Sequence, residues 1–362
     1  MKKILVIDDS ALMRKHLRQM LEEGGYEVFT ARNGEEGLEK IRTLSPDAVT
    51  LDINMPVMDG LTCLSHIMTD SPLPVLMVSS LTEKGALATF EALQLGALDY
   101  VAKPGGTVSL NMQSVKDDLL LKIEAVANSK AFSGKAHGLR DRLRKQREEI
   151  VARPRPETER EVRVSREARS NPDSGIVVIG VSTGGPGTLE EIITQLPADF
   201  PWPVLIAQHM PARFTRVFSE RLNGQCRIEV AELERATELV PGQVLVARGD
   251  ADVKLVQRRS KILATSIPSR SQYLWHPSVE LMVESAGECY EPESIICVQL
   301  TGMGNDGAEA MARLNRQGAR TIAQSEESCV VFGMPKELID RGGADVVLPT
   351  EKVAQQLVDW VY

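Results

Sequence analysis

The sequence predicts two α/β domains, each built on a doubly wound parallel sheet, joined by a charged linker. Short apolar runs alternate with stretches of helical periodicity in both halves of the chain. The length of 362 residues exceeds that of one average domain. The segment between the halves is rich in charge and poor in large apolar residues. We therefore expect domains over residues 1–125 and 174–362, separated by a linker over 126–173.

In the first domain the expected elements alternate along the chain. An apolar strand at Ile4–Ile7 precedes a helix over Ala11–Glu23, which ends at two glycines. Strands separated by helices form a parallel sheet with helices on both faces. The other expected elements are strands at Val28–Ala31, Ala48–Leu51, Val75–Val78 and Tyr100–Ala102 and a helix at Gly34–Leu44.

The linker differs from both domains in composition. Between Lys135 and Arg169 it holds 12 Lys or Arg and 7 Asp or Glu, and almost no large apolar residue follows Val151. Such a segment buries too little surface to fold alone. We expect a helix over Leu119–Ala131 at its start and a solvated, disordered connector beyond.

In the second domain the first expected strand leads into a serine. The run Ile176–Val181 stops at Ser182 and turns on glycines into a helix expected to begin near Thr188 or Leu189. Open α/β sheets build their functional sites at the carboxyl ends of such strands. The further strands are expected at Val204–Gln208, Ile228–Ala231, Val244–Val246, Ile295–Leu300, Thr321–Ala323 and Val346–Leu348.

Composition limits the classes of function. A net charge of −8 at pH 7 argues against nucleic acid as a main partner. The amino terminus turns acidic after a short apolar run, unlike a secretory signal, and no apolar stretch is long enough to span a membrane. The five cysteines are odd in number and widely spread, which favours reduced thiols. We expect a cytoplasmic monomer that is not inserted in a membrane.

Carboxylates follow two strands of the first domain. Asp8 and Asp9 come directly after the first strand, and Asp52 after the third. Three carboxylates at one sheet edge repel one another unless a hard cation such as Mg²⁺ is bound, although helix capping would also explain Asp8 and Asp9. Lys103 and Ser79 follow two further strands and reach the same edge. The set is suited to phosphoryl transfer onto Asp52, with Mg²⁺ and Lys103 neutralising charge.

These residues, with Met55-Pro56, Asp59-Gly60 and Tyr100, resemble the response-regulator receiver family over about residues 1–125. The resemblance implies a flavodoxin-like fold and phosphorylation of Asp52 by a histidine kinase. It also implies a Mg²⁺ site and a pair of switch residues. The implied Mg²⁺ ligands are Asp9, Asp52 and the main-chain carbonyl of Asn54, with Asp8 acting through water, and the implied switch residues are Ser79 and Tyr100.

Ser182 has two candidate partners at other strand ends. A serine hydroxyl needs a base at neutral pH, and histidine is the natural one. His209 directly follows an apolar strand, whereas His276 is typical of a helix start or a cleft wall. Asp306 follows another strand within a glycine-rich loop and could orient the histidine. Ser182, His209 and Asp306 therefore form a candidate catalytic triad.

Acyl transfer also needs hydrogen-bond donors for an oxyanion. The main-chain amides of Thr183 and Met303 are candidates, because both lie in glycine-rich turns. The turn over residues 184–187 could instead cradle a phosphate. It lacks the lysine of a phosphate-binding loop and the spacing of a dinucleotide fingerprint, which makes nucleotide binding the weaker interpretation.

Three motifs resemble the catalytic domain of the bacterial chemotaxis protein-glutamate methylesterases. They are Gly-x-Ser-Thr-Gly-Gly, Gln-His-Met-Pro and Leu-Thr-Gly-Met-Gly-x-Asp-Gly-Ala, in this order. Val181 stands where the family more often has Ala, and Glu280 where it has Asp. The resemblance implies a Rossmann-like domain that hydrolyses glutamate methyl esters on chemoreceptors and deamidates receptor glutamines, with no cofactor for the esterase reaction. The receiver in front would cover the cleft until Asp52 is phosphorylated.

Other functions remain open from the sequence. A receiver-regulated hydrolase acting on a different ester or amide would carry the same residues. A binding module with an inactive serine site is opposed by the intact triad residues, and only the basic linker supports a phospho-regulated transcription factor. Arg213 and Arg216 could meet an acidic receptor surface or simply be solvated.

Overall fold

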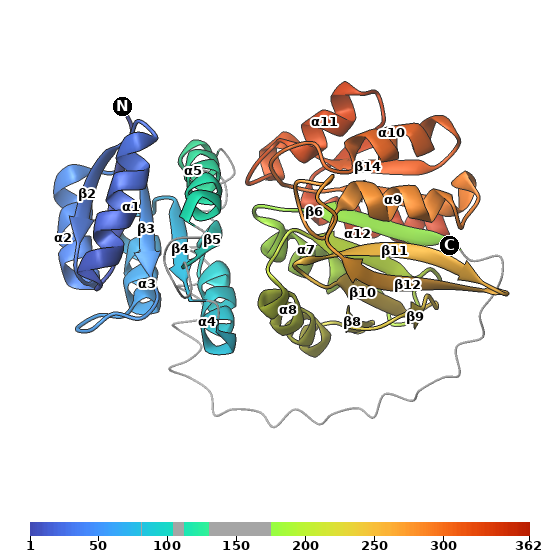
Figure 1. Cartoon of the computed structure of the whole chain (residues 1–362), viewed down its shortest axis with the longest axis horizontal. Helices are drawn as coiled ribbons and strands as arrows, with labels where there is room; N and C mark the ends of the chain where they lie inside the picture. Colours follow the sequence, from blue (N-terminus) through green and yellow to red (C-terminus); the bar gives the residue numbers. More distant parts are fainter. Residues whose placement is uncertain (81, 104–111, 130–174) are drawn as a thin grey trace.

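The structure, a computed structural model, describes residues 1–80, 82–103, 112–129 and 175–362. It contains two parallel sheets with helices on both faces, so the predicted fold class is confirmed (Figure 1). Nearly all of the predicted linker lies outside the described residues, and its disorder stays a prediction. None of the described helices combines the length and the apolar character that crossing a membrane requires.

The first sheet has the strand order β2-β1-β3-β4-β5. All of its pairs are parallel. The order places β1 between β2 and β3, so the carboxyl ends of β1 and β3 are neighbours. The elements are β1 (Lys3–Ile7), α1 (Ala11–Glu23), β2 (Glu27–Ala31), α2 (Gly34–Leu44), β3 (Ala48–Asp52), α3 (Gly60–Asp70), β4 (Val75–Ser79), α4 (Glu83–Gln94), β5 (Asp99–Ala102) and α5 (Met112–Asn128).

The second sheet has the order β15-β14-β13-β6-β7-β10-β8, also all parallel. Its strands and those of a small third sheet are β6 (Ile176–Val181), β7 (Val204–Gln208), β8 (Glu229–Leu233), β9 (Thr237–Glu238), β10 (Gln243–Ala247), β11 (Ala251–Arg258), β12 (Lys261–Pro268), β13 (Ile295–Gln299), β14 (Arg320–Gln324) and β15 (Val346–Leu348). The helices are α7 (Gly185–Ile193), α8 (Ala212–Gln225), α9 (Val279–Gly287), α10 (Ala308–Arg316), α11 (Met334–Asp340) and α12 (Thr350–Val361), with short 3₁₀ turns at Pro292–Ser294 and Glu326–Ser328.

Burial on both faces explains why the strands of the second sheet are continuous apolar runs. Ile176 and Val178 of β6 belong to one hydrophobic cluster, with residues of α9, α10 and α11. Val177 and Ile179 belong to another, with residues of α7, α8 and α12. Alternate side chains of a strand point to opposite faces, so both faces must be apolar. This is the reason that the predicted strand bounds are close to those observed.

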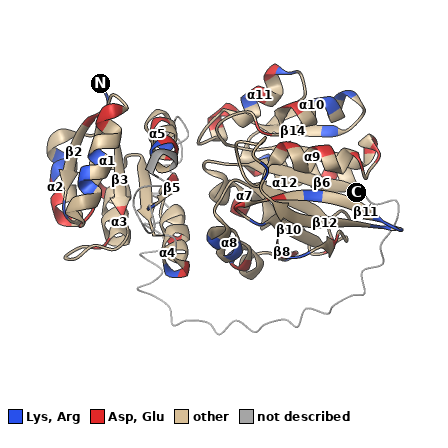
Figure 2. Cartoon of the chain, in the orientation of Figure 1, with Lys and Arg blue, Asp and Glu red and all other residues tan. Residues whose placement is uncertain are grey.

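Three strands were not predicted. They form an antiparallel sheet of order β11-β12-β9 beside the main sheet. Only three residues of β11 are buried, Asp252, Val253 and Leu255, and the β11–β12 turn is made by Arg259 and Ser260 rather than by glycine or asparagine. Arg259 adopts φ 56°, and the tip carries the basic side chains of Arg258, Arg259 and Lys261 (Figure 2). Without a long apolar run or a usual turn signal, the hairpin is hard to predict.

The expected start of α7 near Thr188 or Leu189 is wrong, because the helix begins at Gly185. Gly184 takes the left-handed conformation, φ 78°, which allows the strand to turn directly into the helix. Pro186 occupies the first turn, where a missing amide costs nothing. A Cβ at Gly185 would lie 2.0 Å from Gln208 Oε1 and 2.6 Å from Val181 Cγ2, so a larger residue there would have to displace these side chains.

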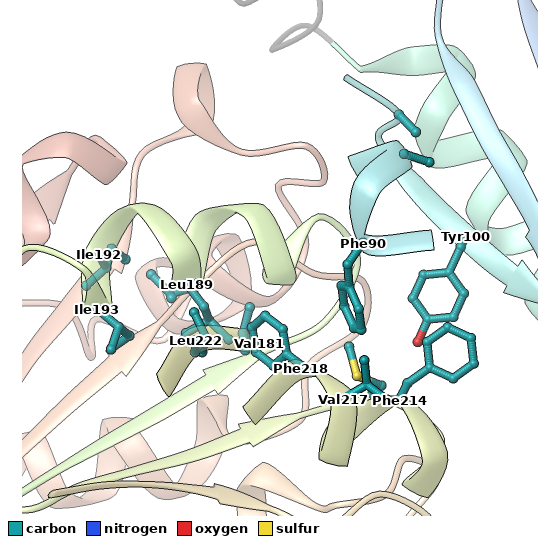
Figure 3. Close-up of a cluster of buried hydrophobic side chains, with 14 of the residues drawn as sticks. Phe90, Tyr100, Val181, Leu189, Ile192, Ile193, Phe214, Val217, Phe218 and Leu222 are labelled. Atoms are coloured by element: carbon teal, nitrogen blue, oxygen red, sulfur yellow. The ribbon is translucent and has the colours of Figure 1, made fainter. Parts of the chain in front are cut away.

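Aromatic side chains join the two domains. The ring of Phe90 on α4 stacks on Phe218 of α8 with 5.4 Å between centroids and meets Phe214 edge-on at 6.2 Å. Tyr100 of β5 stacks on Phe214 at 4.5 Å (Figure 3). All four rings are at most 3% exposed. Gln94 Nε2 adds a hydrogen bond of 2.7 Å to Glu190 Oε1 on α7. The first domain therefore packs on the helices that follow β6 and β7.

Candidate functional site

The carboxyl ends of β6, β7 and β13 lie side by side in the second sheet. Val181 ends β6 and pairs with Gln208 of β7, so Ser182 and His209 follow paired positions. The His209 amide donates to Val181 O at 3.1 Å, and the Ser182 amide donates to Thr301 O at 3.0 Å, just beyond β13. Strand order thus brings Ser182, His209 and the loop that carries Asp306 to one edge.

His209 and Asp306 are in direct contact. His209 Nε2 lies 2.9 Å from Asp306 Oδ2, and both side chains are less than 10% exposed. A carboxylate only accepts, so the proton of neutral His209 lies on Nε2. Nδ1 is buried and has no hydrogen-bond partner among the described residues. Nδ1 is therefore the ring nitrogen that is free to take a proton.

The amino terminus of α9 holds the Asp306 carboxylate. Val279 N donates to Oδ2 at 2.7 Å and Glu280 N donates to Oδ1 at 2.9 Å. Ser278, the N-cap of α9, donates its hydroxyl to Oδ1 at 3.3 Å. Helix amino termini favour anions because their amides are unpaired and the helix dipole is positive there. These contacts fix the orientation of Asp306 against His209.

Glycine at position 302 lets the loop after β13 approach the serine. A Cβ on Gly302 would lie 2.7 Å from Ser182 Cβ and 2.4 Å from Met334 Sδ. In the described part of the chain, the main-chain amides of Thr183 and Met303 donate to no protein acceptor. Both predicted donors are thus unpaired and lie in the turns that meet at Ser182.

The carboxyl ends of β1 and β3 bring together the predicted carboxylates of the first domain. Oxygen atoms of Asp8, Asp9 and Asp52 all lie within 4.8 Å of one another. Lys103 Nζ lies 2.8 Å from Asp52 Oδ2 and 3.0 Å from Asp8 Oδ2. Asp8 and Asp52 are buried, whereas Asp9 is exposed. Three carboxylates against a single lysine leave negative charge uncompensated, and their oxygens are the ligands that Mg²⁺ prefers, so these residues fit that ion.

Burial raises the pKa of Asp52. The neighbouring Lys103 ammonium lowers it in part, Asp8 adds to the rise, and a hydrogen bond from the main chain of Asn54 lowers it again. Asn54 itself is exposed beside this cluster. The ionised form of Asp52 is thus destabilised by the fold in the absence of a cation.

The two predicted switch residues lie in different surroundings. The hydroxyl of Ser79 is fully buried, accepts from Thr89 Oγ1 at 2.8 Å and donates to Gly85 O at 3.2 Å, which ties β4 to α4. Tyr100 is not beside the carboxylates but in the domain interface, on the ring of Phe214. The Lys122 ammonium lies over the same Tyr100 ring, with Nζ 5.1 Å from the ring centroid.

Sequence reasoning missed two neighbours of the candidate triad. The Trp275 ring stacks against His209 with 5.9 Å between centroids and 8° between planes. Asp99 of the first domain is 3% exposed, and burial raises the pKa of its carboxyl group. A hydrogen bond with the Thr183 side chain is one of the interactions that limit this rise. The only sequence signal for Trp275 is the short run Tyr273-Leu274-Trp275 between polar residues before α9.

Three further predicted residues have new partners in the structure. Arg213 and Arg216 line a polar cavity between the domains together with Glu83 of α4. Arg216 also pairs with Glu220 at 3.1 Å. His276 lies just before α9, as expected, and its Nδ1 lies 2.8 Å from Asp252 Oδ1.

The raised pKa of Asp52 predicts a stabilising substitution. Below the ordinary carboxyl value of 3.8 the group is neutral in both states, so Asp52→Asn should change little. Above the raised folded pKa the charge penalises the fold, so the variant should have the higher free energy of unfolding at pH 7. Urea titrations without divalent cations at several pH values would measure this difference. Two results would contradict this prediction. One is a gain in the free energy of unfolding of Asp52→Asn that stays constant toward acid pH, and the other is the same gain on substitution of an exposed carboxyl, Asp70→Asn.

Known protein families match both halves of the chain. A model described as CheB methylesterase matches residues 177–357, and one described as response regulator receiver domain matches residues 4–113. The crystal structure of the Thermotoga maritima CheB methylesterase catalytic domain is 40% identical, with a TM-score of 0.50, and covers 52% of this chain and 99% of that one.

Full-length relatives show the same combination. A protein-glutamate methylesterase/protein-glutamine glutaminase 3 of Rhodospirillum rubrum is 52% identical over 369 residues, covering 100% of this chain and 96% of the relative. A protein-glutamate methylesterase/protein-glutamine glutaminase 2 of Rhodopseudomonas palustris is 49% identical, covering 99% of this chain and 98% of the relative. The chain therefore belongs to the protein-glutamate methylesterase/protein-glutamine glutaminase family, with a receiver domain before the catalytic domain.

Proposed function

We propose that this protein is a receiver-controlled serine hydrolase that removes methyl groups from glutamate esters of chemoreceptors and deamidates receptor glutamines. The observation that supports the proposal is that Ser182 and His209 directly follow the paired strands β6 and β7, with Asp306 Oδ2 2.9 Å from His209 Nε2. The names of its close relatives support the same substrates.

In the proposed reaction His209 acts as the base through Nδ1. Ser182 Oγ attacks the ester carbonyl carbon while its proton passes to Nδ1, and the carbonyl electron pair becomes an oxyanion. The tetrahedral intermediate expels methanol, whose oxygen takes the proton from Nδ1. Water then attacks the acyl-enzyme by the same route and releases glutamate. Glutamine follows the same steps with ammonia as the leaving group.

Asp306 and two amides have supporting roles in this scheme. Asp306 accepts from Nε2 at 2.9 Å and so stabilises the imidazolium that forms during attack. The unpaired amides of Thr183 and Met303 are available to the oxyanion. The close approach of Gly302 to Ser182 keeps the second of these amides near the nucleophile.

Control would begin at Asp52. A histidine kinase would transfer its phosphoryl group to the Asp52 carboxylate, and Lys103 would balance the added charge. Asp8, Asp9, Asp52 and the Asn54 carbonyl would hold Mg²⁺, which supplies charge neutralisation at the phosphoryl oxygens. Ser79 and α4 share hydrogen bonds, so a change at the phosphoacceptor would reach the helix that carries Phe90.

The domain interface supports inhibition of the catalytic domain by the receiver. Asp99 contacts Thr183, the residue after the nucleophile. Val330 packs in a hydrophobic cluster with receiver residues and, from the other side, would be 2.5 Å from a Cβ on Gly184. Thr183 and Gly184, the two residues after Ser182, thus lie against groups in the interface, and separation of the domains would expose this turn.

Substitution of the triad should abolish methanol release from methylated chemoreceptor membranes. Ser182→Ala should remove it to background, and Asp306→Asn should lower kcat by about 10³- to 10⁴-fold, because the imidazole loses its orienting acceptor. Ser260→Ala, at an exposed position of the hairpin tip, is the matched control and should be fully active. Normal release by Ser182→Ala would exclude the proposed nucleophile.

Control by the receiver predicts different effects for two substitutions. Asp52→Ala should keep the basal rate and lose stimulation by a small phosphodonor with Mg²⁺. Phe90→Ala should raise the basal rate without phosphodonor, because the aromatic contacts that hold the domains together are weakened. Leu87→Ala, 52% exposed on the same helix, should do neither. Methanol release measured for all three would test the scheme, and stimulation that persists in Asp52→Ala would rule out Asp52 as the phosphoacceptor.

A further inference from the structure

A buried carboxylate outside the candidate triad contacts the segment next to it. Asp252 lies on β11 of the small antiparallel sheet, and its side chain is 0% exposed. No role was predicted for it, because β11 itself was not predicted. Burying a carboxylate is costly unless hydrogen bonds compensate, so its partners indicate what it stabilises.

Within the described residues, every side-chain hydrogen bond of Asp252 goes to the segment over residues 270–278, which joins β12 to α9. Oδ2 accepts from Arg270 N at 2.9 Å. Oδ1 accepts from Ser278 N at 3.0 Å and lies 2.8 Å from His276 Nδ1. One carboxylate therefore holds both ends of this segment and the His276 side chain near its carboxyl end. We call residues 270–278 the α9 leader.

The α9 leader contacts two members of the candidate triad. Trp275 stacks on the His209 ring, and it also covers the loop after β13, since a Cβ on Gly304 would lie 2.6 Å from the indole. Ser278 ends the leader, caps α9 and donates its hydroxyl to Asp306. The next two amides, of Val279 and Glu280, also donate to Asp306. The position of the leader thus determines the surroundings of both His209 and Asp306.

We propose that Asp252 is a positioning residue for the hydrolase reaction, which fixes the α9 leader so that Trp275 lies against His209 and the amino terminus of α9 holds Asp306. The inference rests on the proposed function, because it assigns Asp252 to the same reaction. The hydrogen bonds of Asp252 go to residues other than the triad, so it acts through Trp275, Ser278 and the first turn of α9.

The chemistry requires a carboxylate at position 252. Its partners there are two main-chain N–H groups and an imidazole nitrogen, and Asp accepts with both oxygens. Asparagine has the same shape, but its NH₂ group can only donate. In Asp252→Asn the NH₂ group would face either Arg270 N or the buried Ser278 N, so at least one donor would lose its acceptor; an unpaired donor costs about 1–3 kcal/mol when it is buried. The leader is then expected to shift, and a displacement of about 1 Å near reacting groups can cost roughly 10²-fold in rate.

The rate at which a fluorophosphonate labels Ser182 tests this proposal without a chemoreceptor. Asp252→Asn should label about 10- to 100-fold more slowly than the wild-type chain. Its acid limb of rate against pH should move to lower pH, because a misplaced Asp306 stabilises the His209 imidazolium less. A loss of folded protein would lower the amplitude of labelling but would not move this limb.

Asp345→Asn is the matched control. The Asp345 carboxylate also accepts a hydrogen bond from a main-chain amide, that of Thr321, at 2.7 Å. Thr321 lies at the start of β14, at the opposite end of the sheet from the strand ends that carry the candidate triad. Asp345→Asn should lower thermal stability and leave the labelling rate and its pH limb unchanged. Labelling of Asp252→Asn within twofold of wild type, with the same pH limb, would overturn the proposal.

His276 keeps the test decisive if Asp252→Asn does not fold. Its side chain is 25% exposed, so substitution is tolerable. His276→Ala removes one of the three donors and should slow labelling, whereas His276→Asn keeps a donor and should slow it less. Equal labelling of wild type, His276→Ala and His276→Asn would also overturn the proposal. If the wild-type chain is labelled but releases no methanol, the proposed substrate is wrong, and the comparison of labelling rates still decides the role of Asp252.

Discussion

The position of β6 between β7 and β13 is the constraint on which the candidate active site depends. Parallel pairing on both sides of β6 brings three carboxyl ends to one edge, with Val181 opposite Gln208 and Gly180 opposite Gln299. Ser182, His209 and the loop that carries Asp306 then meet although they are far apart in sequence. The same rule operates in the receiver domain, where β1 lies between β2 and β3 and brings Asp8 beside Asp52. One geometric principle thus builds both sites.

The two sites are connected through helices that pack on each other rather than through a shared sheet. Phe90 and Tyr100 of the receiver lie on Phe214 and Phe218 of α8, the helix that follows His209. On the catalytic side, α9 holds Asp306 by its amino terminus, and Asp252 holds the leader before α9. The hydrolase site is therefore fixed from one side by α9 and approached from the other by the receiver. Such an arrangement allows a two-state control in which only the receiver contact changes.

Most of both sheets was predictable, because strands buried on two faces are unbroken apolar runs, as in Ile176–Val181. The β11–β12 hairpin was not, since β11 is half buried and its turn holds Arg259 instead of glycine or asparagine. Site residues at strand ends could be predicted from position and chemistry alone. The residues that hold these site residues in place could not be predicted, because Asp252 and Trp275 reach the site only through tertiary contacts that leave no local sequence pattern. For the same reason, the sequence around Tyr100, which was expected to be a switch residue, does not indicate its contact with Phe214.

We propose that the receiver limits access to Ser182 and that phosphorylation removes this limit. Fluorophosphonate labelling of Ser182 in the full chain, with and without a small phosphodonor and Mg²⁺, would show this without a chemoreceptor or methanol detection. Labelling should be faster with phosphodonor in the wild-type chain and should not change in Asp52→Ala. Equal labelling rates in the wild-type chain under both conditions, while methanol release rises, would contradict this proposal and locate control at substrate docking instead.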